Sequence, residues 1–250
     1  MLTVTRTMPS RSASPGPRKA TRRGSSAVSI AVRPRPIVNV RSFPPPARYT
    51  PATMAHHTYC PRCSMTLTTK EDGGRERPAC PACDYVHYGD FSIGCAGVVI
   101  RERKALLVQR GWQPFAGSWQ LPGGYAEHDE PLAEAVEREV REEAGIEARV
   151  RDVIAFRHTV AGPMGGPSTN IYVVFRLDPL GAGDPRFDGN EIANAGFFSL
   201  EEMAAMEAVQ GLSKWAIEKA LRMGDGYGLQ PEPAGPLAGR PGWQLFGLQA

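Results

Sequence analysis

Hydrophobic and polar residues alternate with two different periods in the middle of the chain. Three short apolar runs, rich in Val, Ile and aromatic residues, predict strands at residues 93–100, 105–109 and 170–177. Residues 131–144 place apolar side chains every three to four positions and stop at Gly145, which predicts a helix with Pro131 in its first turn. Two further helices are predicted, at residues 200–206 and 213–223. This mixture of elements favours a compact α/β sandwich.

Composition divides the chain into four segments. Residues 1–56 are low-complexity and rich in proline, residues 58–90 hold four of the five cysteines, and residues 91–222 contain the predicted strands and helices. Residues 223–250 are rich in Gly and Pro and predict a loose tail, in which Trp243 is one of a few apolar residues that could dock elsewhere. No run of about 18 apolar residues occurs, so no membrane-spanning segment is expected.

The net charge of +3 hides a strong asymmetry between the N-terminal segment and the rest of the chain. Residues 1–57 contain ten Lys and Arg residues and no Asp or Glu, so the remainder carries a charge of about −7. An Arg-rich, Ser-rich segment without acidic residues is typical of an organelle transit peptide, and its early prolines favour a chloroplast over a mitochondrion. The alternatives are a disordered basic tail that binds nucleic acid or anionic surfaces, or a translation start at Met54.

Four cysteines form two CxxC pairs separated by sixteen residues: Cys60, Cys63, Cys80 and Cys83. Four thiolates at this spacing predict a structural Zn²⁺ site, and a segment of some thirty residues needs such a metal to fold. Disulfides and a redox pair are the alternatives, and the absence of a secretory signal disfavours disulfides. The resulting zinc ribbon could contact nucleic acid, serve as a scaffold or support a dimer.

The other potential metal ligands near the ribbon are predicted to have no role in it. His56, His57 and His87 lie close by in sequence, but four thiolates already complete a structural zinc shell, so these histidines are interpreted as bystanders. Cys95 stands alone in an apolar run and is predicted to be a buried core thiol.

Three carboxylates are spaced to share one face of the predicted helix 131–144. Glu139, Glu142 and Glu143 stand at positions i, i+3 and i+4, and such a group suits a hard divalent cation such as Mg²⁺. The alternative is an ordinary solvated helix with a charged face. Gly123 and Gly124 argue for a site, because a glycine pair before the helix lets the backbone approach a metal or phosphate closely.

Residues 124–146 resemble the Nudix box, G-x5-E-x7-R-E-U-x-E-E-x-G-U, where U is bulky and apolar. The matching positions are Gly124, Glu130, Arg138, Glu139, Val140, Glu142, Glu143, Gly145 and Ile146. The resemblance covers roughly residues 91–222. It implies an α/β fold, the Nudix α/β/α sandwich with a mixed sheet, here preceded by a small zinc ribbon.

The resemblance also implies roles for individual residues. The ligands of Mg²⁺ or Mn²⁺ would be Glu139, Glu142 and Glu143, with the Gly124 carbonyl as a further ligand. Arg138 and Glu130 would form an ion pair that holds the loop to the helix. The implied chemistry is metal-assisted hydrolysis of a pyrophosphate bond. The general base would be one of the box glutamates or Glu191.

A ribbon ahead of a Nudix box resembles two groups of hydrolases. One group acts on NADH or NAD-capped RNA, and its members carry an SQPWPFP-like segment that residues 156–170 lack. The other acts on FAD or ADP-ribose, which is therefore the preferred substrate class, with release of AMP. Hydrolysis of oxidised nucleoside triphosphates and non-catalytic binding of nucleotides or RNA are the alternatives.

The expected partner is a small nucleotide-type molecule; a membrane and nucleic acid are not expected, and a homodimer is suggested by analogy with ribbon-bearing relatives. Five residues are candidates for substrate contact: Arg110, Trp112, Phe115, Arg157 and His158. The aromatic pair could stack a base, and the arginines could meet phosphate. Simple loop packing or solvation is the alternative for each of them.

Overall fold

The computed structural model describes residues 57–161, 168–224, 227–234, 240 and 242–248. All of these belong to the second of two compact units, Thr50–Ala250. The predicted leader, with His56 at its end, lies outside the described residues. Part of the segment 156–170 is also outside them. No helix in the described part of the chain is long and apolar enough to cross a membrane.

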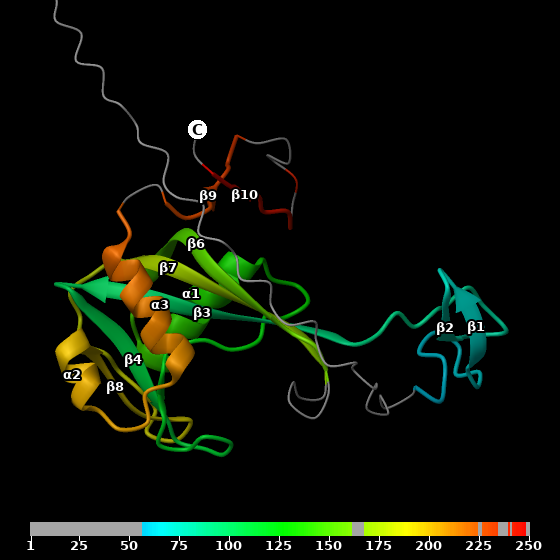
Figure 1. Ribbon diagram of the computed structural model, residues 1–250, viewed down its shortest axis with the longest axis horizontal. Helices are drawn as coiled ribbons and strands as arrows, with labels where there is room; N and C mark the ends of the chain where they lie inside the picture. Colours follow the sequence, from blue (N-terminus) through cyan, green and yellow to red (C-terminus); the bar gives the residue numbers. More distant parts are fainter. Residues whose placement is uncertain (1–56, 162–167, 225–226, 235–239, 241, 249–250) are drawn as a thin grey trace, which may run out of the picture. The chain divides into compact units, whose positions relative to one another are not determined.

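A mixed sheet of six strands forms the centre of the main domain (Figure 1). Its strands are β3 (Phe91–Arg101), β4 (Lys104–Arg110), β5 (Trp119–Gln120), β6 (Ala148–Thr159), β7 (Thr169–Pro179) and β8 (Ile192–Phe198). The order is β5-β4-β3-β7-β6, with β8 also paired to β4. Strands β3 and β7 run parallel, and the remaining pairs are antiparallel.

Helices cover both faces of this sheet, because successive side chains of its central strands point in opposite directions. In β3, Cys95 and Val99 pack towards α1 (Leu132–Ala144), whereas Ala96 and Val98 pack towards α2 (Leu200–Ala205) and α3 (Gly211–Arg222). Two buried clusters result, one on each face. The predicted α/β/α sandwich with a mixed sheet is confirmed.

Helix α1 ends where the sequence predicts. Gly145 adopts a left-handed conformation with φ of 63°, and its N–H donates to the Arg141 carbonyl. At the other end Pro131 is the N-cap, and no side chain within the helix turn caps it. The helix buries Val136 and Val140 against the sheet, which leaves the charged face to the loop before it.

The ribbon segment contains a two-stranded hairpin, β1 (Thr68–Asp72) and β2 (Arg75–Ala79). Gly73 and Gly74 join the strands with φ values of 61° and 75°. A tight hairpin turn requires positive φ at both central residues, which glycine adopts without steric cost. In residues 57–90 the buried side chains are few and include Cys60, Ala79 and Cys80. The hairpin therefore has almost no hydrophobic core of its own.

The C-terminal segment is more ordered than its composition predicts. Strands β9 (Gln230–Pro231) and β10 (Phe246–Gly247) pair with each other, and Phe246 contacts Phe175 with 5.8 Å between ring centroids. The side chain of Gln244 accepts a hydrogen bond of 3.3 Å from the N–H of Ala133, so it caps the first turn of α1.

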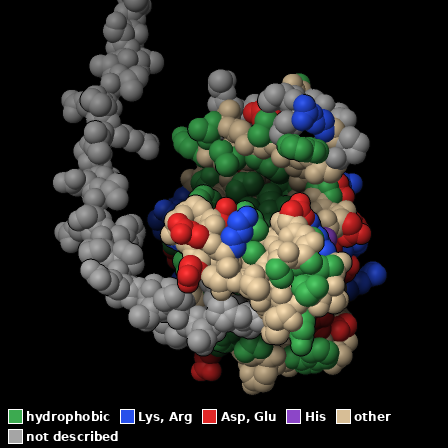
Figure 2. Space-filling view, turned by 90° about the vertical axis from the view of Figure 1, so that its right-hand side faces the viewer, with side chains coloured by type: hydrophobic (Ala, Val, Ile, Leu, Met, Phe, Trp, Pro, Cys, Tyr) green, Lys and Arg blue, Asp and Glu red, His purple; other side chains and the backbone are tan. Residues whose placement is uncertain are grey.

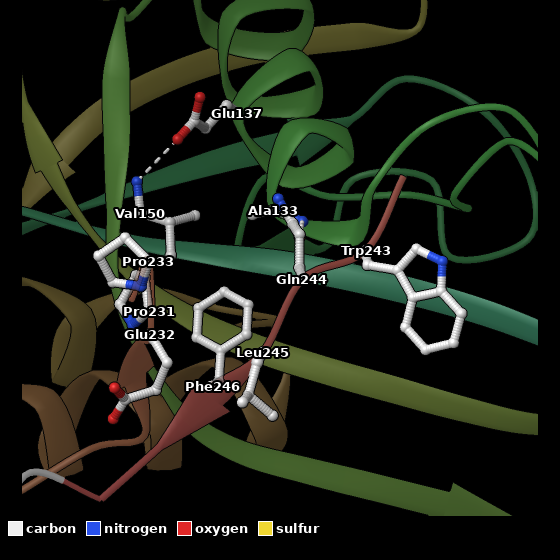
Figure 3. A pocket seen from close by; sticks show the side chains of 10 residues that line it. All are labelled: Ala133, Glu137, Val150, Pro231, Glu232, Pro233, Trp243, Gln244, Leu245 and Phe246. Atoms are coloured by element: carbon white, nitrogen blue, oxygen red, sulfur yellow. Dashed lines mark hydrogen bonds between the residues drawn. The ribbon is translucent and has the colours of Figure 1, made fainter. Parts of the chain in front are cut away.

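A cavity of about 310 Å³ lies between this hairpin and α1. Figure 3 shows Gln244 reaching towards Ala133, and Glu137 bonded to the backbone of Val150 on the other side of the cavity. A recess with hydrophobic walls and charged residues around its mouth is visible on the face drawn in Figure 2. The C-terminal hairpin is thus part of the packing around α1.

Candidate active site

The loop before α1 is packed tightly against the helix. The N–H of Gly123 donates to Glu143 Oε2 at 2.8 Å, and the Gly124 carbonyl accepts from the N–H of Cys95 at 2.9 Å. A Cβ on Gly123 would lie 2.1 Å from the Cys95 carbonyl oxygen, and one on Gly124 would lie 2.6 Å from Glu139 Oε1. Gly123, with φ of 157° and a backbone neighbour, requires glycine, whereas a side chain at Gly124 would displace the carboxylate of Glu139.

Arg138 and Glu130 form the ion pair that the resemblance implies. Nη2 of Arg138 lies 2.7 Å from Glu130 Oε1, and Nε lies 3.0 Å from Oε2. Hydrogen bonding to Arg138 lowers the pKa of Glu130 below its usual range. Glu130 also accepts the N–H of Glu127 at 2.9 Å. The bidentate contact fixes the end of the loop to the middle of the helix.

The three predicted ligands lie on one side of α1, but their carboxylate oxygens are not all within 4.8 Å of one another, and their environments differ. Glu143 is buried, Glu139 is largely covered, and the Glu142 side chain is 53% exposed. Arg138 Nη1 lies 2.9 Å from both Glu139 Oε1 and Glu142 Oε2. One guanidinium therefore balances part of a charge that three carboxylates concentrate on one side of α1.

Burial disfavours the ionised form of two of these carboxylates. Desolvation raises the pKa of Glu143 to about 8, with the charges of Glu139 and Glu191 acting in the same direction. Desolvation also raises the pKa of Glu139. Clustered oxygen donors that resist ionisation without a counter-charge fit a divalent cation such as Mg²⁺ or Mn²⁺, which would supply that charge.

Glu191 lies near enough to influence the carboxylates of α1. It precedes β8, where the Asp188 carboxylate accepts its N–H at 3.1 Å and its carbonyl accepts the N–H of Gly111 at 2.7 Å. Its charge raises the pKa of both Glu139 and Glu143. The structure thus brings a fourth carboxylate, distant in sequence, to the three on α1.

A separate hollow, which none of the four carboxylates lines, contains three of the five candidate substrate contacts, Arg110, Phe115 and Arg157. The charge of Arg110 partly opposes the rise in the pKa of Glu143, so this hollow lies within electrostatic reach of that carboxylate. Trp112 donates to Asn190 Oδ1 at 3.1 Å and does not line the hollow, and His158 is exposed on β6.

Sequence reasoning missed several residues of the hollow, including Tyr172, Gln120 and Gln210. Arg157 lies over the Tyr172 ring at 4.9 Å from its centroid. Tyr172 pairs in register with Gly94, where an added Cβ would lie 2.6 Å from the ring. A tyrosine in a buried strand opposite a glycine was the available signal for this residue.

The four ribbon cysteines come together as predicted. Sγ of Cys60 lies 3.7 Å from that of Cys83, and Sγ of Cys63 lies 3.5 Å from that of Cys80. Zinc–sulfur bonds of about 2.3 Å in a tetrahedron place the sulfurs about 3.8 Å apart. All four thiols are free, and the backbone N–H groups of Arg62 and Ala82 point at two of them. The donor set fits Zn²⁺.

The pKa values of the ribbon thiols shift in opposite directions: those of Cys63 and Cys83 are raised, and that of Cys80 is lowered. Burial raises the pKa of Cys80, but hydrogen bonds from the N–H of Ala82 and from neighbouring thiols outweigh burial and lower the pKa to about 7. A thiolate is the form that binds metal. Cys95, in contrast, is fully buried in β3, and burial raises its pKa to about 12, which agrees with a core thiol.

Three relatives are similar to parts of the chain. An ADP-ribose pyrophosphatase of Methanocaldococcus jannaschii is 32% identical over 113 residues, covering 45% of this chain and 64% of the relative. The NAD-capped RNA hydrolase NudC of Stutzerimonas stutzeri is 27% identical over 185 residues, covering 73% of this chain and 62% of the relative. The human nucleoside diphosphate-linked moiety X motif 6 is 31% identical over 126 residues, and the chain spans 37% of its length. In each case the chain covers less than two thirds of the relative.

The fold has a counterpart among solved structures. A NUDIX hydrolase from Nitrosomonas europaea superposes with a TM-score of 0.55 at 24% identity, covering 66% of this chain and 90% of that structure. The family model described as NUDIX domain matches residues 92–217. This range includes α1, Gly123 and Gly124 of the loop before it, and Glu191. The chain belongs to the NUDIX family.

Proposed function

We propose that this protein hydrolyses the pyrophosphate bond of a nucleoside diphosphate-linked compound, with FAD or ADP-ribose as substrate and AMP as one product. The observation that carries the proposal is the carboxylate cluster of Glu139, Glu142 and Glu143, partly desolvated and held in place by the Arg138–Glu130 pair. A helix that only faced solvent would not bury Glu143 against the backbone of Gly123.

The cluster suits metal-assisted attack of water on phosphorus. Glu139, Glu142 and Glu143 would hold Mg²⁺, which when bound supplies positive charge to the phosphate oxygens and acidifies a water ligand. Glu143 or Glu191 accepts the proton of the attacking water. The water oxygen forms a bond to one phosphorus while the bond from that phosphorus to the bridging oxygen breaks, so two monophosphates leave. Arg110 is placed to meet their negative charge.

The hollow that Arg110 lines supports a substrate with an adenosine half. Arg157 and Tyr172 present a stacked cation and ring, and Gln120 and Gln210 add hydrogen-bonding groups, linked to each other at 2.8 Å. Such a surface accepts a flat base through stacking and polar contacts. The relatives named for ADP-ribose and NAD-capped RNA act on compounds with the same adenosine diphosphate half.

The remaining expectations are part of the same proposal. The four thiols of the ribbon hold one structural Zn²⁺, and residues 1–56 direct the protein to a chloroplast, with a mitochondrion as the alternative. The homodimer expected by analogy stays a prediction.

The experiment is a product assay of the full chain with Mg²⁺ and four separate substrates: FAD, ADP-ribose, NADH and 8-oxo-dGTP. We expect AMP from FAD or ADP-ribose at a rate well above that from NADH, and no preference for the oxidised triphosphate. Glu142→Gln removes a metal ligand that is half exposed, so it abolishes turnover without unfolding the protein. Glu134→Gln, on the exposed face of the same helix, is the matched control and keeps full activity.

Two outcomes would change the proposal. Preference for NADH would retain the chemistry but move the substrate to the other ribbon-bearing group. No turnover of any compound, together with tight nucleotide or RNA binding, would support the non-catalytic alternative instead.

A further inference from the structure

Two of the histidines interpreted as bystanders form a cluster outside the four-cysteine site. His57, His87 and Asp90 each offer one ligand atom, and these atoms lie within 4.8 Å of one another. His57 precedes the first CxxC pair, and His87 and Asp90 follow the second, so the cluster joins the two ends of the ribbon segment. The sequence analysis set both histidines aside because four thiolates complete a zinc shell, and His57 lies thirty positions before His87, so their meeting with Asp90 left no local signal.

The distances within the cluster match those between ligands of one small cation. Nε2 of His57 lies 3.2 Å from Asp90 Oδ1, and Nε2 of His87 lies 3.9 Å from the same oxygen. In a tetrahedral site with bonds of about 2.0–2.1 Å, neighbouring ligand atoms are about 3.3 Å apart. Small side-chain rotations therefore suffice to bring all three atoms onto a metal.

The orientation of His87 is already fixed in the way that metal sites require. Its Nδ1 lies 3.3 Å from the hydroxyl of Tyr85, which leaves Nε2 directed to Asp90. Histidines that bind metal usually hold their second ring nitrogen in such a hydrogen bond. The His87 side chain is also well covered, at 12% exposure, whereas those of His57 and Asp90 are 45% and 56% exposed.

The guanidinium of Arg77 is the nearby positive charge, and its contacts direct it away from the cluster. Arg77 lines the same hollow as His57, but its Nε faces Asp72 at 3.6 Å and its guanidinium lies over the Tyr88 ring at 4.8 Å. The His57 and His87 rings lie edge to face with centroids 4.5 Å apart. The Nε2 atoms of both imidazoles thus face the same carboxylate oxygen of Asp90.

We propose that His57, His87 and Asp90 form a second metal site that binds a divalent transition cation of the zinc type, with water in the remaining position. Two imidazoles and a carboxylate are a donor set that suits such ions. The bound ion closes a loop of more than thirty residues and so holds both ends of the ribbon together where the chain enters β3. It is distinct from the ion expected between the four thiols.

The test is a metal titration of the full chain with Co²⁺, in excess Mg²⁺ so that the Nudix carboxylates are occupied. Thiolate ligands give Co²⁺ intense charge-transfer bands, whereas imidazole and carboxylate ligands do not. We expect one equivalent with these bands and a second equivalent, at micromolar or tighter affinity, without them. His57→Gln and Asp90→Asn each remove the second equivalent and preserve the first, which also reports that the ribbon is folded.

His158→Gln is the matched control, because it removes an exposed imidazole from β6 and should leave both equivalents in place. Anomalous scattering from crystals grown with Zn²⁺ should show a separate peak between the three side chains. A single equivalent in the wild-type protein would overturn the proposal and leave an ordinary histidine–aspartate ion pair. Retention of the second equivalent in both cluster variants would also overturn it, because the ion would then bind elsewhere.

Discussion

The burial of Glu143 sets the chemistry of the site. Helical residues are separated by about 100°, so Glu142 and Glu143 point to opposite sides of the direction of Glu139. Glu143 is thereby turned towards the sheet and Glu142 towards solvent. A carboxylate in this position costs free energy when it ionises, and only a bound cation or a proton removes that cost.

This cost predicts a pH dependence for the protein without added Mg²⁺. The pKa of Glu143 is about 8 in the folded protein against 4.5 for an ordinary glutamate. Between these values the unfolded chain loses a proton that the folded protein keeps, so the free energy of unfolding falls as pH rises from about 4.5 to 8. Glu143→Gln removes this decline, which amounts to roughly 4 kcal/mol across the whole interval.

Urea unfolding at several pH values, with and without Mg²⁺, measures the effect. Glu147→Gln changes an exposed carboxylate just beyond the same helix and should keep the wild-type pH dependence. Parallel pH curves for wild type and Glu143→Gln would show that Glu143 ionises freely. Added Mg²⁺ should flatten the wild-type curve, because the cation compensates the ionised form.

The close packing around Gly123 predicts that adding a side chain there destabilises the loop. An alanine there places its Cβ 2.1 Å from the Cys95 carbonyl oxygen, a backbone atom of a central strand that cannot move easily. We expect Gly123→Ala to cost about 3 kcal/mol in unfolding free energy and to lower activity by displacing the loop from Glu143. Gly183→Ala, where nothing lies within 4 Å, should change neither; equal melting temperatures for both variants would contradict the prediction.

Helix α1 was predicted closely, whereas strands β5, β6 and β8 of the sheet were not predicted. The spacing of Val136 and Val140 and the stop at Gly145 predicted α1 to within one residue at its start. Strand β6 escaped prediction because its pairing with β7 shifts register twice, between Val150 and Asp152 and again between Val153 and Ala155. Each bulge reverses which side chains face the core, so the strict alternation that marks a strand is lost.

The site residues differ in the same way: those in one local motif were predictable, and those that come from separate elements were not. Glu139, Glu142, Glu143, Arg138 and Glu130 follow from one contiguous motif that ends a loop and continues along one helix. Arg138 contacts Glu130, Glu139 and Glu142, and Glu143 is bonded to the loop at Gly123. Tyr172 and Gln210 come from β7 and the start of α3, and only the folded arrangement brings them to one hollow. Long-range contacts of this kind leave no local periodic signal.

The C-terminal hairpin was expected to be loose, and its packing leads to a stability prediction. Phe246 contacts Phe175 and belongs to the edge of the cluster that buries α1. Phe246→Ala should lower the free energy of unfolding by about 2 kcal/mol, less than for a fully buried phenylalanine. Leu248→Ala is the control, because that side chain is 71% exposed two residues away. Equal thermal stability of the two variants would mean that the hairpin does not pack on the domain in solution.

Over the whole chain, hydrophobic packing and metal binding are unequally distributed. Both buried clusters are built from residues that follow Asp90, whereas the ribbon buries only Cys60, Ala79 and Cys80. The main domain can therefore hold its fold by apolar burial, whereas the ribbon, as proposed, depends on ions bound by its thiols and by the His57 cluster.

This division predicts selective unfolding when the zinc site is removed. Replacing Cys60 and Cys63 by serine leaves two ligands, too few for a structural zinc site, so residues 58–90 lose their fold. The domain from β3 onwards keeps its own core, its carboxylate cluster and therefore its melting temperature and pyrophosphatase activity. Limited proteolysis followed by mass spectrometry should give cuts confined to the ribbon and a stable fragment that begins near β3. If the same variant instead loses activity and unfolds in one transition at lower temperature, the ribbon supports the catalytic domain directly, and the two cannot be treated as separate folding units.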